Sequence, residues 1–99
     1  RKVVHLAAVF ACNFSNHMYA IADEILGASN IELDVLRPLI KETALKVQNA
    51  NPLDMQTGPA VRNDQKTIEH HLNMLKGSEE YKSMYEIITK NIQDHHGKL

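Results

Sequence analysis

The N-terminal stretch Arg1–Gly27, "RKVVHLAAVFACNFSNHMYAIADEILG", decides the fold. From Val3 to Cys12 its residues are apolar except for His5, and neither glycine nor proline occurs before Gly27. A helix that is apolar all round is normally buried on all sides. We therefore predict one long helix from about Lys2 to Gly27, with Gly27 as its C′ residue. The other helices of a 99-residue chain can hardly surround it, so we expect a second subunit or another domain to cover part of it.

A second helix is predicted from about Glu32 to Ala50, with Ser29 or Asn30 as its cap. Pro38 lacks an N–H, so it should kink this helix or mark its true first turn. The inner face should carry apolar residues at helical spacing, together with one threonine: Leu36, Leu39, Ile40, Thr43 and Val47.

After the break at Asn51–Pro52, two further helices are predicted. One runs from about Gln65 to Lys76, capped by Asn63 or Asp64 and ended by Gly77, with Ile68, His71, Leu72 and Leu75 on one side. The other follows the cap Ser78 and carries an apolar stripe of Tyr81, Met84, Tyr85, Ile88 and Ile92. The last residues, 94–99, should fray. The predicted class is all-α with four main helices and no strand.

Length and charge limit the possible functions. The chain has 99 residues, with 11 Lys+Arg and 12 Asp+Glu, so its net charge is -1. It therefore lacks the excess of positive charge that is typical of a nucleic-acid-binding protein. One cysteine, Cys12, suits a reducing compartment, and neither a signal peptide nor a membrane span is evident, so we predict a cytoplasmic location without nucleic-acid or membrane partners. Because no initiator Met or cap precedes the first helix, we expect a fragment of a longer protein, or else a processed end.

Polar residues gather on one side of the long first helix. At about 100° per residue, His5, Asn13, Asn16 and His17 fall within an arc of about 120°. Buried amides and imidazoles need hydrogen-bond partners, so this strip is expected to line an interface, a cleft or a ligand. Polar contacts between helices, or a solvated face, are the alternatives.

The stretch "QTGPAVRNDQKT", Gln56–Thr67, is the one clear interruption of helical sequence. Gly58 permits a backbone conformation that other residues avoid, and Asp64 suits the N-cap of the next helix. The turn does not explain Arg62. Its guanidinium suits a carboxylate or phosphate, and free N–H groups at the helix start also attract anions, so an anion site is possible here. A salt bridge to Asp or Glu is the alternative.

Other motifs are weaker. The adjacent pairs His70–His71 and His95–His96 lack the spacing that puts two metal ligands on one helix face, and we predict no metal site. Cys12 is interpreted as a packing residue. A Gly-rich phosphate loop after a strand is also missing, so the sequence carries no dinucleotide fingerprint of its own.

Three stretches together resemble a known family: "HLAAVFACNFSNHMYAIADEIL" (His5–Leu26), "PLIKETALKV" (Pro38–Val47) and "QTGPAVRNDQKTIEHHL" (Gln56–Leu72). They look like domain of unknown function 2520, the C-terminal helical domain of Rossmann-like NAD(P)-dependent oxidoreductases. That family is similar in architecture to the group of pyrroline-5-carboxylate reductase and the 6-phosphogluconate dehydrogenase C-terminal domain. The resemblance covers about nine-tenths of the chain.

The resemblance implies that residues 1–99 form one α-helical C-terminal domain. A separate upstream Rossmann domain would bind NADP or NAD, and this fragment alone would bind neither. The long helix would lie at a homodimer interface, and the site would accept a small anionic substrate. The residues expected at the cleft are Asn13, Asn16, Thr57, Gly58, Arg62 and Asp64.

The catalytic residues are not identified by the resemblance. Related hydroxyacid dehydrogenases carry a lysine followed by asparagine on the first long helix, and here no lysine follows Lys2 in that helix. His5 or His17 is the candidate acid–base group, since histidine titrates near neutrality. The fragment itself is expected to be inactive.

Three functions follow from these observations. The first is the substrate-binding and dimerisation domain of an NAD(P)-dependent oxidoreductase. The second is a stand-alone helical module that self-associates without catalysis. A metal-binding bundle is the third.

Overall fold

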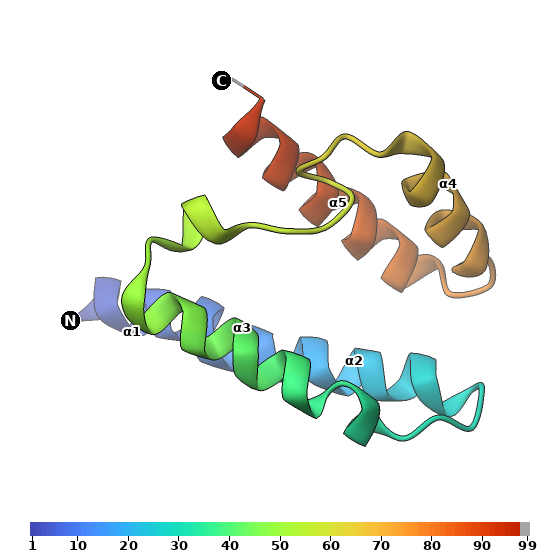
Figure 1. The fold of residues 1–99 in the computed structure, drawn as a ribbon, viewed down its shortest axis with the longest axis horizontal. Coiled ribbons are helices and arrows are strands. Elements are labelled where there is room, and N and C mark those ends of the chain that lie inside the picture. Colours follow the sequence, from blue (N-terminus) through green and yellow to red (C-terminus); the bar gives the residue numbers. More distant parts are fainter. Residues whose placement is uncertain (98–99) are drawn as a thin grey trace. The chain divides into compact units, whose positions relative to one another are not determined.

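The computed structural model describes residues 1–97, which form helices joined by short turns (Figure 1). Within this range there is no strand, and the predicted all-α fold with four main helices and a long first helix is confirmed. The chain divides into two compact units, Arg1–Asn49 and Ala50–Leu99.

The first unit opens with a continuous helical stretch whose ends match the prediction. It consists of α1 (Lys2–Ala8), a π-helical segment (Val9–Phe14) and α2 (Ser15–Gly27). The π-helical segment was not foreseen. Its i→i+5 turns are wider than α-turns, so it changes the angle between residues on either side of it. The arc of about 120° predicted for His5, Asn13, Asn16 and His17 assumes a uniform α-helix, which this segment interrupts.

The end of this helix corrects the role predicted for Gly27, which is the last helical residue and does not have a positive φ. The left-handed residue is Asn30, at φ 58°. The N–H of Ile31 donates to the carbonyl of Leu26 (3.0 Å) and that of Asn30 to Gly27 (3.0 Å), which is the Schellman pattern with Asn30 at C′. Asparagine takes this position because it tolerates the left-handed conformation better than most residues.

The second helix begins later than predicted, at Arg37 in place of Glu32. A 3₁₀ turn (Leu33–Val35) precedes α3 (Arg37–Asn49), and neither Ser29 nor Asn30 caps it. Pro38 lies in the first turn of α3, where its missing N–H leaves no helical hydrogen bond unmade. The turn before it is braced by an ion pair between Arg37 Nε and Asp34 Oδ1 (2.6 Å).

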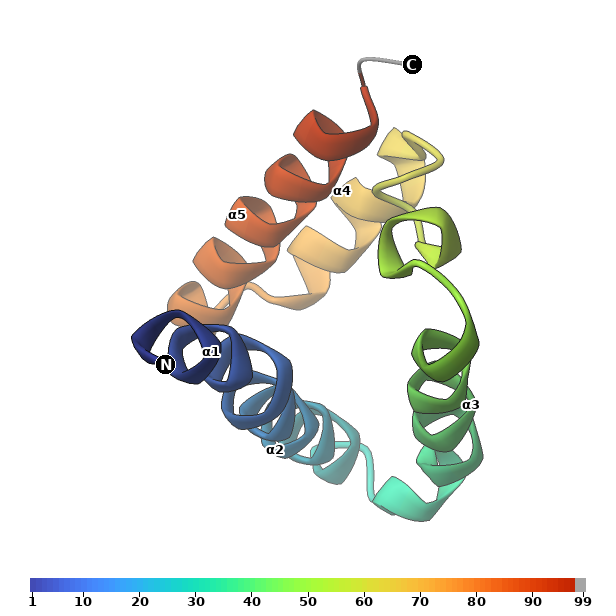
Figure 2. The same ribbon diagram turned by 90° about the vertical axis from the view of Figure 1, so that its left-hand side faces the viewer.

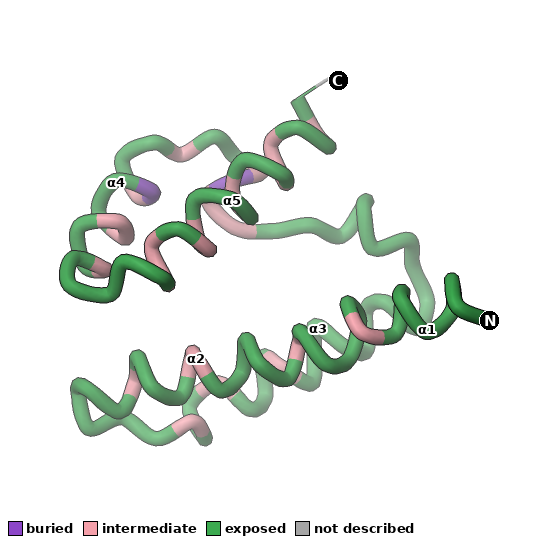
Figure 3. Tube along the Cα trace, turned by 180° about the vertical axis from the view of Figure 1, so that it is seen from behind, coloured by how far each residue is buried: buried purple, intermediate pink, exposed green. Residues whose placement is uncertain are grey.

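Arg1–Asn49 contains no buried residue, so the apolar first helix is not buried in the described chain, and its cover by a second subunit or another domain stays a prediction (Figure 3). Val3 is 77% exposed and Phe10 is 63% exposed. On α3, the predicted inner residues Leu39 and Val47 are exposed as well. Besides the long first helix, this 49-residue unit contains one short 3₁₀ turn and α3. These two elements are too few to enclose a helix that is apolar on all sides.

The second unit is built around a helical hairpin. A 3₁₀ turn (Pro52–Met55), capped by the side chain of Asn51, leads through a loop into α4 (Gln65–Met74). After a turn at Gly77 (φ 90°), α5 (Glu79–His96) returns antiparallel beside α4 (Figures 1 and 2).

This unit holds the buried residues of the described chain: Ala60 in the loop and Ile68 on α4. Ile68 lies on the predicted inner face of its helix. Of the stripe predicted on α5, Ile88 is exposed while the other four residues are half-buried. The helix continues to His96, through residues that were expected to fray, and Lys98 and Leu99 lie outside the described residues. Ser78 occupies the predicted cap position, but its side chain makes no capping hydrogen bond.

Candidate functional site

The loop before α4 folds into a tight turn that fixes Arg62 and Asp64. Gly58 adopts φ 105°, as its sequence context predicts, and Asn63 is also left-handed at φ 53°. The N–H of Asp64 donates to the carbonyl of Pro59 (2.9 Å), and buried Ala60 anchors the turn. This geometry places the charged pair beside the start of α4.

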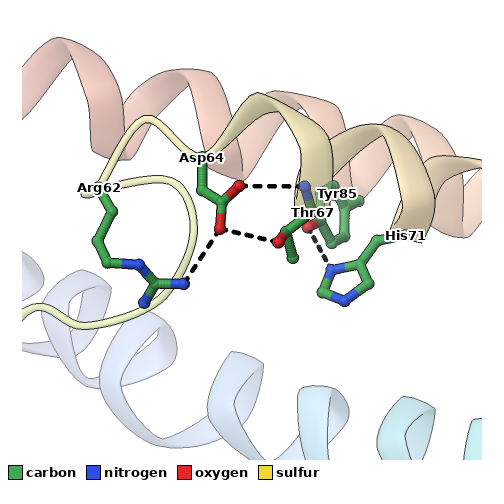
Figure 4. Close-up of polar contacts among 5 residues, drawn as sticks. All are labelled: Arg62, Asp64, Thr67, His71 and Tyr85. Atoms are coloured by element: carbon green, nitrogen blue, oxygen red, sulfur yellow. Dashed lines mark hydrogen bonds and ion pairs between the residues drawn. The ribbon is translucent and has the colours of Figure 1, made fainter.

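Asp64 is the N-cap of α4, as predicted. Its Oδ1 accepts the backbone N–H of Thr67 (3.2 Å), and its Oδ2 accepts the Thr67 hydroxyl (2.8 Å; Figure 4). These two hydrogen bonds, with a smaller contribution from Arg62, lower the pKa of Asp64 below its ordinary value. The carboxylate is therefore a fixed anion at neutral pH whose main task is to begin the helix.

Arg62 makes a local ion pair, with Nη2 at 3.6 Å from Asp64 Oδ2. That separation is long for a charge-assisted hydrogen bond, and the Arg62 side chain is 60% exposed, so the pair contributes little to stability. Within the described residues, Arg62 has no second ion pair. The structure thus contains the salt bridge weighed as the alternative, yet most of the guanidinium edge stays accessible to an anion.

A polar contact between the two helices of the hairpin was not predicted from the sequence. His71 Nδ1 on α4 lies 2.7 Å from the hydroxyl of Tyr85 on α5, and the rings meet edge to face at 5.7 Å (Figure 4). Burial raises the pKa of Tyr85, so the phenol stays protonated at neutral pH. The sequence did contain a signal for this contact, because His71 and Tyr85 were both predicted on the inner faces of their helices. They were not predicted to pair with each other.

The other predicted site residues lie on other elements of the chain. His5 is on α1, Asn13 is in the π-helical segment, and Asn16 and His17 are on α2; all four are exposed, and none makes a side-chain hydrogen bond or ion pair with another described residue. In the second unit, Thr57 is exposed and precedes Gly58 in the loop. Of the predicted set, the structure joins Arg62 with Asp64 through a side-chain contact.

The remaining sequence features that could indicate a function are the cysteine, a metal site and a membrane span. Cys12 is exposed, which corrects its interpretation as a packing residue. Among residues 1–97, no group of three or more His, Cys, Asp or Glu side chains is placed to hold a metal ion. In the same range, no helix has the length and apolar character needed to cross a bilayer.

Two shallow grooves lie within the second unit. One, of about 130 Å³, is lined by both hairpin helices, including Ile68 and Tyr85. The other, of about 270 Å³, lies where residues around Ala60 meet the end of α5. None of the predicted site residues lines either groove.

Comparison with known proteins places these features in a family. A structure search matches a Bacteroides fragilis protein named "putative NADP oxidoreductase", with 49% identity and a TM-score of 0.93 over 95% of this chain. The chain spans 36% of the length of that protein. A search of curated proteins found no match. The family model described as Domain of unknown function (DUF2520) matches residues 1–92. The chain therefore belongs to the family Domain of unknown function (DUF2520).

Proposed function

We propose that this chain is the substrate-binding and dimerisation domain of an NADP-dependent oxidoreductase whose Rossmann domain lies elsewhere in the protein. The main support is the match to a longer protein that is named an NADP oxidoreductase, with 49% sequence identity and a TM-score of 0.93. Identity at this level over 95% of the chain supports a shared role within a larger enzyme.

The exposed apolar surface of the first helix supports the dimerisation part of the proposal. Val3, Val4, Leu6, Phe10 and Phe14 are all exposed, and Phe10 and Phe14 already stack edge to face at 5.0 Å. Apolar surface gains about 25 cal/mol for each Å² removed from water. A contiguous apolar helix of this length is typical of an interface, and a second copy of the chain is the proposed occupant.

In this proposal, the Rossmann domain binds the cofactor. A dinucleotide site of that type needs a strand, a Gly-rich loop and a helix, and residues 1–97 contain no strand. The nicotinamide would supply the hydride chemistry when bound. This chain would contribute groups that hold and orient the substrate, with Arg62 as the anion contact and Asn13, Asn16, Thr57 and Gly58 near the cleft.

The test uses the full-length protein. Titration with NADPH and NADH, followed by nicotinamide fluorescence, should show saturable binding, with NADPH bound more tightly. Light scattering across a concentration series should give the mass of a dimer. A full-length protein that binds neither nucleotide and stays monomeric would overturn the proposal. A dimer that binds neither nucleotide would favour the stand-alone self-association module.

A further inference from the structure

Three polar side chains lie in register along one face of α4 and its N-cap. Asp64, Thr67 and His71 are spaced three and four residues apart, which places them on the same side of the helix. At 1.5 Å per residue, Asp64 and His71 lie about 10 Å apart along the axis. Arg62 extends this row beyond the helix start, and its side chain and that of His71 lie on the same side of α4 (Figure 4). The row ends in a guanidinium at one end and an imidazole at the other.

The imidazole of His71 is held in one orientation. Its Nδ1 is occupied by the Tyr85 hydroxyl at 2.7 Å, and the edge-to-face contact at 5.7 Å restrains the ring plane. Because Nδ1 is occupied, Nε2 is the nitrogen left for another partner. By contrast, His5 and His17 are exposed and have no polar contact with a described residue that would orient them.

The guanidinium at the other end is available to a ligand. The oxygens of Asp64 are shared between Thr67 and one nitrogen of Arg62, so the carboxylate does not occupy the whole guanidinium fork. Arginine can hold a carboxylate or phosphate through two parallel N–H bonds, and its exposed nitrogens suffice for one such anion.

We propose that this face of α4 binds a small organic anion, with Arg62 holding the acid group, His71 exchanging a proton with a carbonyl or hydroxyl oxygen through Nε2, and Tyr85 acting as the positioning residue. The inference rests on the proposed function and adds the substrate class and the acid–base group. In the reducing direction, reduced nicotinamide bound by the Rossmann domain would supply a hydride to the carbonyl carbon, and the C=O π electrons would move to oxygen. The oxygen takes the proton from His71 Nε2, and water returns a proton to the imidazole.

The test uses full-length protein labelled with ¹⁵N-histidine and glutarate, a five-carbon dicarboxylate, as the probe. Glutarate should shift the His71 Nε2 resonance saturably, and Arg62→Ala should raise the glutarate Kd at least about tenfold, as expected when a charge-assisted hydrogen bond is lost. Arg37→Ala is the matched control, because Arg37 is an exposed arginine that also pairs with a nearby aspartate. Its Kd should equal that of the wild type.

A second pair of variants separates positioning from binding. Tyr85→Phe should keep the glutarate Kd within about twofold while changing the tautomer balance seen in the His71 nitrogen shifts, because the Nδ1 partner is lost. His70→Gln, beside His71 but exposed, should change neither quantity. The inference is overturned if saturating glutarate leaves His71 Nε2 unshifted, or if Arg62→Ala binds glutarate as the wild type does. In either case, retained NADPH binding would leave the proposed function standing.

Discussion

The two units of this chain use similar helices in different ways. In Ala50–Gly97, α4 is capped by Asp64 and a hydrogen bond joins it to α5, and buried Ile68 lies on its inner face. In Arg1–Asn49, by contrast, no residue is buried, and the side-chain hydrogen bonds of Arg37 and Thr43 reach residues three and four positions away. The second unit therefore carries a small core of its own, whereas the first presents exposed apolar surface.

The difference follows from where the apolar residues fall. Helices α4 and α5 are amphipathic, so the apolar face of each helix can pack against the apolar face of the other. The stretch α1–α2 is apolar on several faces at once, and a single neighbouring helix covers one of them at most. Tertiary packing provides most of the stability of a helix in a protein, so the first unit should depend on association far more than the second.

The largest expected effect is on self-association through the first helix. Phe10→Asp places a charge in the proposed interface, and an uncompensated buried charge costs about 3–5 kcal/mol. The dimer Kd should therefore rise about a hundredfold or more. Light scattering of this chain at several concentrations measures the change.

Ile87→Asp provides the control, because Ile87 is a 69% exposed apolar residue on α5 in the other unit. Its dimer Kd should stay close to that of the wild type. A Phe10→Asp chain that remains a well-folded dimer would show that Phe10 lies outside any interface and would remove the main distinction between the units.

Within the second unit, the core is tested by Ile68→Ala. Ile68 is 6% exposed, and removing a buried isoleucine side chain typically costs about 2–4 kcal/mol. The matched change Ile87→Ala, at an exposed site on the facing helix, should stay within about 0.5 kcal/mol. Urea unfolding at one fixed protein concentration compares them, since dimerisation would otherwise shift the midpoint. Equal losses for the two variants would mean that the hairpin has no distinct core.

Sequence patterns predicted this architecture well wherever the signal was local. The ends of the long helix, the break at Asn51–Pro52, the Asp64 cap and the bend at Gly58 each depend on neighbouring residues and were correct. Composition shows that the first helix is apolar without showing what covers it, so its burial against a second subunit or another domain stays a prediction. The predicted start of the second helix was wrong because residues Leu33–Val35 form a 3₁₀ turn before α3 begins.

The candidate site was predictable in part. Arg62 and Asp64 were chosen from the sequence and lie together, since two residues in one tight turn cannot separate far. The contact between His71 and Tyr85 joins residues 14 positions apart, and pairing them requires the relative rotation of two helices. Single-helix periodicity fixes which face is inward but leaves that rotation undetermined.

Two glycines provide a smaller test with opposite signs in the two units. Gly77 has φ 90°, so Gly77→Ala forces an L side chain into a left-handed conformation and should destabilise by about 1–2 kcal/mol. Gly27 ends α2 without a positive φ, and a Cβ there would meet no atom within 4 Å. Gly27→Ala should therefore be neutral or stabilise by up to about 1 kcal/mol. Thermal unfolding measures both, and a loss at Gly27 matching that at Gly77 would contradict the corrected end of α2.

The smallest expected effect is the acid dependence of the α4 cap. Because hydrogen bonds from Thr67 lower the pKa of Asp64 in the folded chain, its contribution to stability is present above the unfolded pKa of about 3.9. That contribution is lost as the pH falls through the lower, folded value. Thr67→Val removes the hydroxyl donor but keeps the backbone N–H. It should therefore bring the pKa of Asp64 closer to its ordinary value and reduce the loss of stability in acid.

Asp64→Asn keeps a capping oxygen without the titrating carboxyl, so it should flatten this part of the curve of Tm against pH. Asp54→Asn is the control, since Asp54 is an exposed aspartate in the 3₁₀ turn of the same unit. It should leave the acid-dependent loss unchanged. An unaltered curve in Asp64→Asn would show that Asp64 is not the group that titrates, and the cap would then not distinguish the second unit from the first.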